Sequence, residues 1–173
     1  MLSSYLTEYQ RYRLIAEKAL GQVSDDDLNA IPYEDANSMA MLVRHLSGNL
    51  KSRFTDFLTS DGEKPWRHRD EEFRTRTYTR AEVDQMWAEA WDVLDGTLGN
   101  LSEDDMTRLI TIRGQEWPVH GALARSMAHL AYHVGQMVLL ARMAQERDWQ
   151  WITIPKGQST QYNQNPQLER GFK

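Results

Sequence analysis

The chain has 173 residues, a formal net charge of -5 and no cysteine. Its length predicts a single domain with a substantial core. Its acidic balance, without a basic stripe of interleaved aromatics, argues against nucleic-acid binding. The lack of cysteine excludes a disulfide framework, thiolate metal ligands and a thiol nucleophile within the chain.

The N-terminal segment carries a charge within its first ten residues and lacks the apolar stretch of a signal peptide. The longest uncharged run, residues 126–141, contains two histidines. It is shorter than the roughly 18–20 apolar residues that cross a bilayer. We therefore expect a cytoplasmic protein that does not engage a membrane.

Apolar residues recur at helical spacing along most of the chain. The second of these segments starts after Asn37 or Ser38, either of which suits an N-cap. Thr79 followed by Glu82 predicts a capping box at the start of the third segment. Pro118 suits the first turn of the fourth. The apolar stripes of the first three predicted helices cover residues 2–20, 39–57 and 83–101, and the fourth helix covers residues 118–145.

The segments between these helices predict shorter or irregular structure. Residues 24–27 indicate an acidic connector, and residues 60–78 form a long connection whose charges we expect to be solvated. Residues 109–117 place β-branched side chains on both sides of Arg113 and Gly114, which predicts a short hairpin. From residue 148, two tryptophans and two isoleucines predict a tail that packs back on the helices.

Together these elements predict an all-α fold. Four long helices with a long crossover between the second and third indicate a four-helix bundle, with the short hairpin before the fourth helix. We expect residues 1–155 to form the bundle and residues 156–173 to form a polar tail.

Two histidines, His129 and His133, stand four residues apart in the uncharged run. On a helix this spacing turns both rings to one face, with Cβ atoms about 5–6 Å apart. Buried imidazoles need a polar partner, and the spacing alone leaves open whether that partner is a metal or a hydrogen-bonding group. The glutamate of the zincin motif H-E-x-x-H is missing.

A third histidine, His45, lies inside the second predicted helix on the shoulder of its apolar stripe. It is either a partly exposed helical residue or a further metal ligand. Gly48, three residues later, weakens the helix by about 1 kcal/mol relative to alanine, which indicates a packing or access requirement. His68 lies in the charged loop, where we expect it to be solvated. His120, nine residues before His129, faces away from it.

Several segments resemble the DinB/YfiT-like superfamily. A histidine in the second helix, followed by H-x-x-x-H-x-G-Q in the last, is similar to the pattern of that superfamily. Longer strings resemble its uncharacterised YfiT-like branch over most of the chain, namely HLSGNLKSRFTDFLTSDGEKPWRHRDEEF, EWPVHGALARSMAHLAYHVGQ and ITIPKGQSTQYN.

The resemblance implies a DinB-like bundle over residues 1–155 that binds one divalent metal ion through His45, His129 and His133. It also implies a homodimer. Characterised relatives include S-transferases that use bacillithiol or other low-molecular-weight thiols, and a mycothiol-dependent maleylpyruvate isomerase. The resemblance therefore implies a small-molecule substrate, with a low-molecular-weight thiol as a candidate cosubstrate.

Three neutral imidazoles leave an open coordination position on a divalent ion, as in catalytic zinc sites. Zinc or nickel suits these ligands best, and iron or manganese also fits. Because such an ion acidifies a bound water or thiol, both hydrolysis and thiol transfer are open. No carboxylate shares the face of His129 and His133 as a general base, although Glu116 precedes the same helix. This lack favours thiol transfer.

Other polar residues near the predicted site have two interpretations each. Asn49 and Gln136 either orient ligands or make ordinary helix hydrogen bonds, and we expect the latter. The loop arginines Arg67, Arg69 and Arg74 either bind a carboxylate-bearing thiol or belong to a solvated loop, and we expect the latter. No residue is assigned a catalytic role.

Together with the histidine pattern, the resemblance implies a divalent-metal-dependent enzyme, specifically a low-molecular-weight-thiol S-transferase acting on small electrophiles. The alternatives are a metal-dependent hydrolase and a metal- or small-molecule-binding dimer without turnover.

Overall fold

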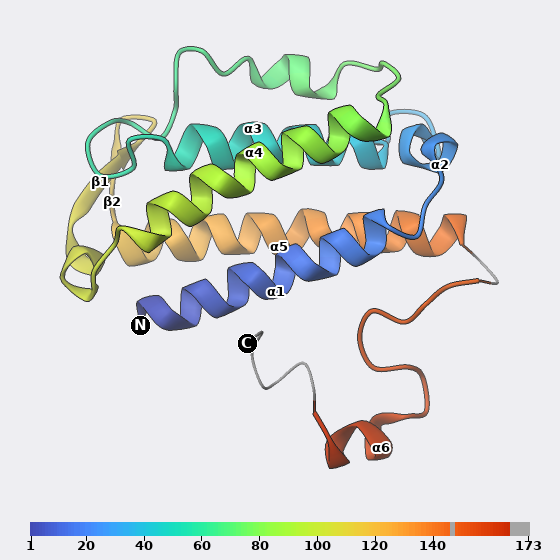
Figure 1. Cartoon of the computed structure of the whole chain (residues 1–173). Helices are drawn as coiled ribbons and strands as arrows, with labels where there is room; N and C mark the ends of the chain where they lie inside the picture. Colours follow the sequence, from blue (N-terminus) through green and yellow to red (C-terminus); the bar gives the residue numbers. More distant parts are fainter. Residues whose placement is uncertain (146–147, 167–173) are drawn as a thin grey trace.

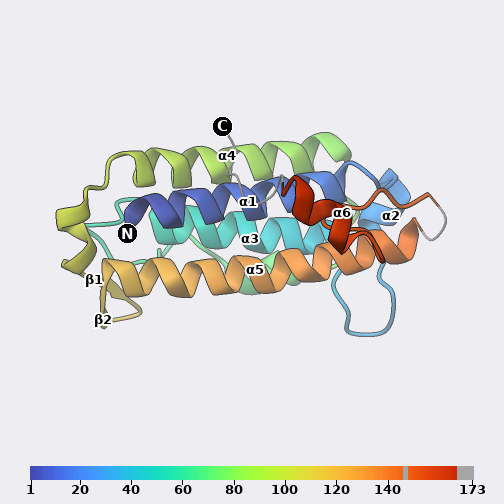
Figure 2. The same ribbon diagram turned by 90° about the horizontal axis from the view of Figure 1, so that it is seen from below.

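A computed structural model describes residues 1–145 and 148–166. This part of the chain is predominantly helical and contains one two-stranded sheet. Four long helices lie side by side in Figures 1 and 2, and they are α1 (Leu2–Leu20), α3 (Met39–Phe54), α4 (Arg80–Gly99) and α5 (Val119–Ala144). Within the described residues, no helix combines the length and apolar character needed to cross a membrane.

Helices α3 and α4 begin where the sequence predicts N-caps, and α5 begins at Val119, directly after Pro118. Of the two candidates before α3, Ser38 caps the helix, because its hydroxyl accepts a hydrogen bond from the backbone N–H of Met41 at 3.2 Å. At the start of α4, Thr79 and Glu82 form the predicted capping box. The apolar stripe of the second helix continues to residue 57, whereas α3 itself ends at Phe54.

The core lies between the four long helices. α3 packs against α4 and α5, and α1 packs against α5. The largest fully buried side chains come from all four of these helices and include Tyr9, Leu42, Trp91 and Leu123. α3 carries one of the five histidines and α5 carries three, and these two helices pack against each other in the core.

Short helices occupy segments predicted to be irregular. The acidic connector forms α2 (Asp25–Asn29), because Ser24 and Asp27 make a capping box that the sequence analysis missed. The 3-10 helices η1 (Arg69–Phe73) and η2 (Glu103–Thr107) lie in the connections before α4 and β1. The tail contains α6 (Ser159–Gln164). The polar end of the tail, residues 167–173, lies outside the described residues.

The predicted hairpin is present. β1 (Leu109–Ile112) and β2 (Gln115–Pro118) pair in antiparallel register. Arg113 and Gly114 form the turn with φ values of 54° and 71°, which is the positive-φ pair that a two-residue hairpin of type I′ requires. The hairpin lies at the end of the molecule where α5 starts, and α2 lies at the opposite end (Figure 1).

The beginning of the tail returns to the helices as predicted. Ile152 is 6% exposed and belongs to the main core. The guanidinium of Arg142, near the end of α5, lies 5.5 Å from the ring centre of Trp149 and 4.8 Å from that of Trp151. The described part of the tail lies on the opposite side of α1 and α5 from the long crossover (Figure 1).

Candidate metal centre

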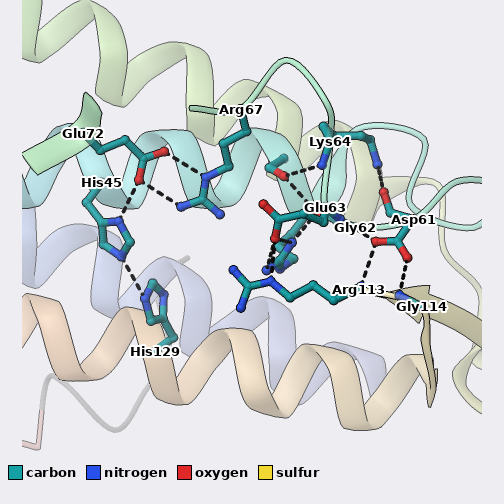
Figure 3. A network of polar contacts seen from close by, with 12 residues as sticks. His45, Asp61, Gly62, Glu63, Lys64, Arg67, Glu72, Arg113, Gly114 and His129 are labelled. Atoms are coloured by element: carbon teal, nitrogen blue, oxygen red, sulfur yellow. Dashed lines mark hydrogen bonds and ion pairs between the residues drawn. The ribbon is translucent and has the colours of Figure 1, made fainter. Parts of the chain in front are cut away.

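Three histidines meet between α3 and α5. His45 comes from α3, and His129 and His133 come from α5. Each offers one ring nitrogen, and these nitrogens all lie within 4.8 Å of one another. The Nε2 atoms of His45 and His129 are 3.1 Å apart (Figure 3). His45 and His133 are buried and His129 is half-buried, so His45 is not a partly exposed helical residue. The cluster is compact enough to hold a metal ion.

Hydrogen bonds at the other ring nitrogen fix two of the three imidazoles. His45 Nδ1 lies 2.8 Å from Glu72 Oε2. Because an ionised carboxylate only accepts hydrogen bonds, Nδ1 carries a proton, and in the neutral ring this leaves the lone pair on Nε2, which faces the cluster. His133 Nδ1 lies 2.8 Å from Gln136 Oε1, which selects the same tautomer. Gln136 therefore orients a histidine, contrary to the ordinary helix hydrogen bond that we expected, and such partners are typical of metal-binding histidines.

The rings of α5 are in the neutral form that binds metals. Burial, followed by the neighbouring His133 and His45 rings, lowers the pKa of His129 to about 3. Burial also lowers the pKa of His133, although its hydrogen bond to Gln136 opposes the shift. Neutral imidazole is the ligand form of histidine, so the donor set fits a divalent cation.

Glu72, predicted to lie in a solvated loop, is a buried carboxylate. Its two oxygens accept hydrogen bonds from Arg67 Nε at 2.8 Å and Nη2 at 2.9 Å (Figure 3). Burial raises the pKa of Glu72, but the hydrogen bonds from His45 and Arg67 outweigh it, and the net pKa is lowered. The prediction of a solvated loop is therefore wrong for Arg67 and Glu72, whereas Asp70 and Arg74 are exposed as predicted.

Gly48 explains how Glu72 reaches the site. A Cβ atom at this position would lie 2.2 Å from Glu72 Oε1, well inside any allowed contact. The glycine inside α3 thus leaves space for the carboxylate that orients His45, one turn away on the helix. The packing requirement indicated by Gly48 in the sequence is confirmed, and its cause is Glu72.

A pocket of about 390 Å³ opens beside the three histidines. Part of its wall is apolar, formed by Phe54, Phe57, Ile112 and Ala122. Asn49 lines it as well, without a hydrogen bond to a histidine among the described residues. Among the described residues no aspartate or glutamate lines this pocket, and Glu116 lies exposed in β2.

The pocket also has an arginine lining that the sequence analysis largely missed. Arg53 follows His45 by eight residues, and Arg125 precedes His129 by four. Both spacings place a side chain on the same helix face as the histidine, and this signal was present in the sequence. His68 and His120 do not line the pocket, as predicted.

The crossover between α3 and α4 and the β1–β2 hairpin together form one wall of the pocket. Arg67 and Arg69 come from the crossover, and Ile112 and Arg113 come from the hairpin. Asp61 ties the two segments, because its carboxylate accepts hydrogen bonds from the backbone N–H groups of Arg113 and Gly114, both at 2.8 Å (Figure 3). The described part of the tail contributes no residue to this pocket.

Comparisons with known proteins place the chain in a family. No curated protein matches it significantly. Among solved structures it is similar to one titled "Crystal structure of the conserved protein of locus from Enterococcus faecalis", with 16% identity, a TM-score of 0.60, and coverage of 83% of this chain and 96% of that one. At this identity the likeness shows the fold alone. A family described as "Protein of unknown function (DUF1572)" matches residues 1–158. The chain therefore belongs to the DUF1572 family.

Proposed function

We propose that this chain is a divalent-metal-dependent enzyme of the DinB/YfiT-like type, in which α1, α3, α4 and α5 form a four-helix bundle. The ligands in this proposal are His45, His129 and His133, and zinc or nickel is the preferred ion. The observation that carries it is the meeting of three ring nitrogens within 4.8 Å at the edge of a pocket.

The reaction we propose is transfer of a low-molecular-weight thiol to a small electrophile. A divalent ion on three neutral imidazoles supplies acidification of a coordinated thiol or water. The chain's own residues favour the thiol, because no carboxylate among the described residues lines the pocket as a general base for water. Phe54 and Phe57 offer an apolar surface to an electrophile. Glu72 and Gln136 hold two rings in the required tautomer. The homodimer remains a prediction.

The metal site is tested by elemental analysis of protein purified without a histidine tag. We expect about one divalent ion per chain in the wild type, and loss of most of this metal in His45→Ala and His129→Ala. His120→Ala is the matched control, because His120 lies on α5 outside the pocket. Equal metal content in all four proteins would contradict the ligand assignment.

The reaction class is tested with the metal-loaded protein. Bacillithiol or a similar thiol with a halogenated aromatic electrophile should give the thioether conjugate, with release of halide and a proton, at a rate that falls to background in His129→Ala. Ester or amide cleavage without thiol would instead assign the hydrolase. If the metal-loaded protein turns over none of a broad panel of such substrates, the result would indicate a metal- or small-molecule-binding protein without catalytic activity.

A further inference from the structure

Five arginines line the pocket beside the histidines, and they come from four separate parts of the chain. Arg53 and Arg125 come from α3 and α5, Arg67 and Arg69 from the crossover, and Arg113 from the hairpin turn. The chain as a whole carries a net charge of -5. The gathering of five cationic side chains around one pocket of an acidic protein is therefore a local feature and does not follow from the composition.

The carboxylates that contact these arginines are fewer than the arginines themselves. Glu63 accepts hydrogen bonds from both Arg53, at 3.2 Å from Nη2, and Arg113, at 2.7 Å from Nε. The single negative charge of Glu63 is thus shared between two guanidinium groups.

The positive charges of Arg69 and Arg125, the two arginines at the rim of the pocket, are offset even less by nearby carboxylates. Asp70 lies 3.9 Å from Arg69 but is fully exposed, so water screens that pair strongly. Among the described residues Arg125 has no carboxylate partner, and its guanidinium lies 5.3 Å from the ring centre of Trp117. The pocket therefore has an excess of positive charge before any metal ion is counted.

The deepest arginine has a donor with no partner. The side chain of Arg67 is 2% exposed, and its Nε and Nη2 atoms are used by Glu72. Its Nη1 atom is buried without a hydrogen-bond partner among the described residues. A buried donor of this kind is costly, and since Arg67 lines the pocket, a ligand there can satisfy it.

The neighbouring arginines are close enough to repel one another. Burial lowers the pKa of Arg53, and the charges of Arg67 and Arg113 add to this shift while Glu63 opposes it. Figure 3 shows the Arg113 side chain extending from the hairpin in the direction of His129. An anion in the pocket would relieve this repulsion and would lie next to the histidine cluster.

We propose that the pocket binds a small anionic molecule whose carboxylate or phosphate oxygens contact these arginines while its reactive part faces His45, His129 and His133. The facing of the reactive part rests on the proposed function, whereas the anion contacts rest on the arginines alone. Guanidinium groups match carboxylate and phosphate oxygens in pairs of hydrogen bonds. The exposed arginines attract the anion to the mouth, and Arg67 and Arg53 hold it at depth.

The test is calorimetric titration of the metal-loaded full chain with succinate, inorganic phosphate and the neutral analogue succinamide. We expect saturable binding of an anion and none of succinamide. Arg69→Gln/Arg125→Gln should weaken anion binding about three- to tenfold, because exposed charge pairs contribute little each. Arg67→Gln should weaken it by more than about tenfold, because its contact is buried. Tighter binding of succinate assigns a carboxylate ligand, and tighter binding of phosphate assigns a phosphoryl ligand.

Arg74→Gln is the matched control, since Arg74 is an exposed arginine of the same crossover that does not line the pocket. Unchanged anion affinity in Arg69→Gln/Arg125→Gln would overturn the inference, as would equal weakening by Arg74→Gln. Arg67→Gln removes one hydrogen-bond partner of Glu72 and could prevent folding. In that case the double variant Arg69→Gln/Arg125→Gln still tests the inference.

Metal content measured on the same samples separates the two proposals. Metal present without arginine-dependent anion binding overturns only this inference. Arginine-dependent anion binding in a protein that holds no metal overturns the proposed function and leaves the anion site standing.

Discussion

At the scale of single residues, the orientation of His45 depends on a buried chain of contacts. Arg67 holds Glu72, and Glu72 holds the Nδ1 side of His45. A carboxylate that receives these hydrogen bonds remains ionised in a buried place, because the charged partners offset the cost of burial. The ring nitrogen that faces the cluster is thereby selected by residues 22 or more positions away along the chain.

The close approach of Gly48 to Glu72 gives a prediction. In Gly48→Ala the added Cβ would overlap Glu72 Oε1, so we expect the carboxylate to move away from His45. Metal affinity should fall by about 10–100-fold, the range typical for loss of a residue that orients a ligand. The measurement is competitive metal titration with a chelator, combined with thermal unfolding.

Gly96→Ala is the matched control for that variant. Gly96 also lies inside a long helix, α4, and a Cβ there meets nothing within 4 Å. This substitution should stabilise the protein by up to about 1 kcal/mol through helix propensity and leave metal affinity unchanged. If Gly48→Ala behaves in the same way, the contact with Glu72 is not what requires glycine.

At the scale of elements, the crossover and the hairpin act together because Asp61 joins them. Its carboxylate accepts backbone hydrogen bonds from Glu63 at 2.7 Å and from both turn residues of the hairpin. Gly62 N–H also donates to Thr111 O of β1 at 2.8 Å. A two-stranded hairpin is marginal by itself, so these contacts and the packing of Ile112 fix the wall of the pocket.

Asp61→Ala should therefore loosen the hairpin. We expect Tm to fall by several degrees, since roughly 1 kcal/mol corresponds to about 2–4 °C in a chain of this size. Hydrogen bonds from the backbone N–H groups of Glu63 and Gly114 lead the causes that hold the pKa of Asp61 below its usual value. The carboxylate thus stabilises the fold above its unfolded-state pKa and loses this effect as pH falls through the lowered pKa.

The difference in Tm between wild type and Asp61→Ala should accordingly be largest at neutral pH and shrink on acidification. Thermal unfolding followed by circular dichroism over a pH series measures this. Asp104→Ala, at an exposed position of η2, is the control and should leave Tm nearly unchanged. A difference that grows on acidification would contradict the anchoring role of Asp61.

At the scale of the whole molecule, the histidine cluster spans the interface between two helices. His45 lies on α3, which also packs on α4, and the pair of histidines lies on α5, which also packs on α1. A ligand held by all three would therefore connect the two sides of the core. The unfolded chain does not bring these residues together, so such a ligand would bind the folded state selectively.

Zinc or nickel should then raise thermal stability. A ligand present at about 1,000 times its Kd adds roughly 4 kcal/mol to the free energy of unfolding, which corresponds to a Tm increase on the order of ten degrees. Differential scanning calorimetry with added metal, and with a chelator, measures the shift. It should disappear in His129→Ala and persist in His120→Ala. An equal shift in both variants would indicate metal binding outside the cluster.

The sequence by itself determined the local elements. Apolar spacing gives the four long helices, the Thr79–Glu82 box gives the start of α4, and the Arg113–Gly114 pair gives the hairpin turn. Each of these depends on interactions within a few residues, which composition and order encode directly. The spacing of His129 and His133 belongs to the same class, since one helix presents both rings on one face.

Only the tertiary structure decided which distant residues share the site. That Glu72 is buried against His45, while Asp70 from the same short segment is exposed, depends on how the crossover lies on α3. The arginines from α3, α5, the crossover and the hairpin likewise meet only in the folded chain. The three histidines, and by their spacing Arg53 and Arg125, could be placed on helix faces from the sequence. The burial of Glu72 and Arg67 and the approach of Arg113 could not, because burial and charge pairing arise from contacts between segments far apart in sequence.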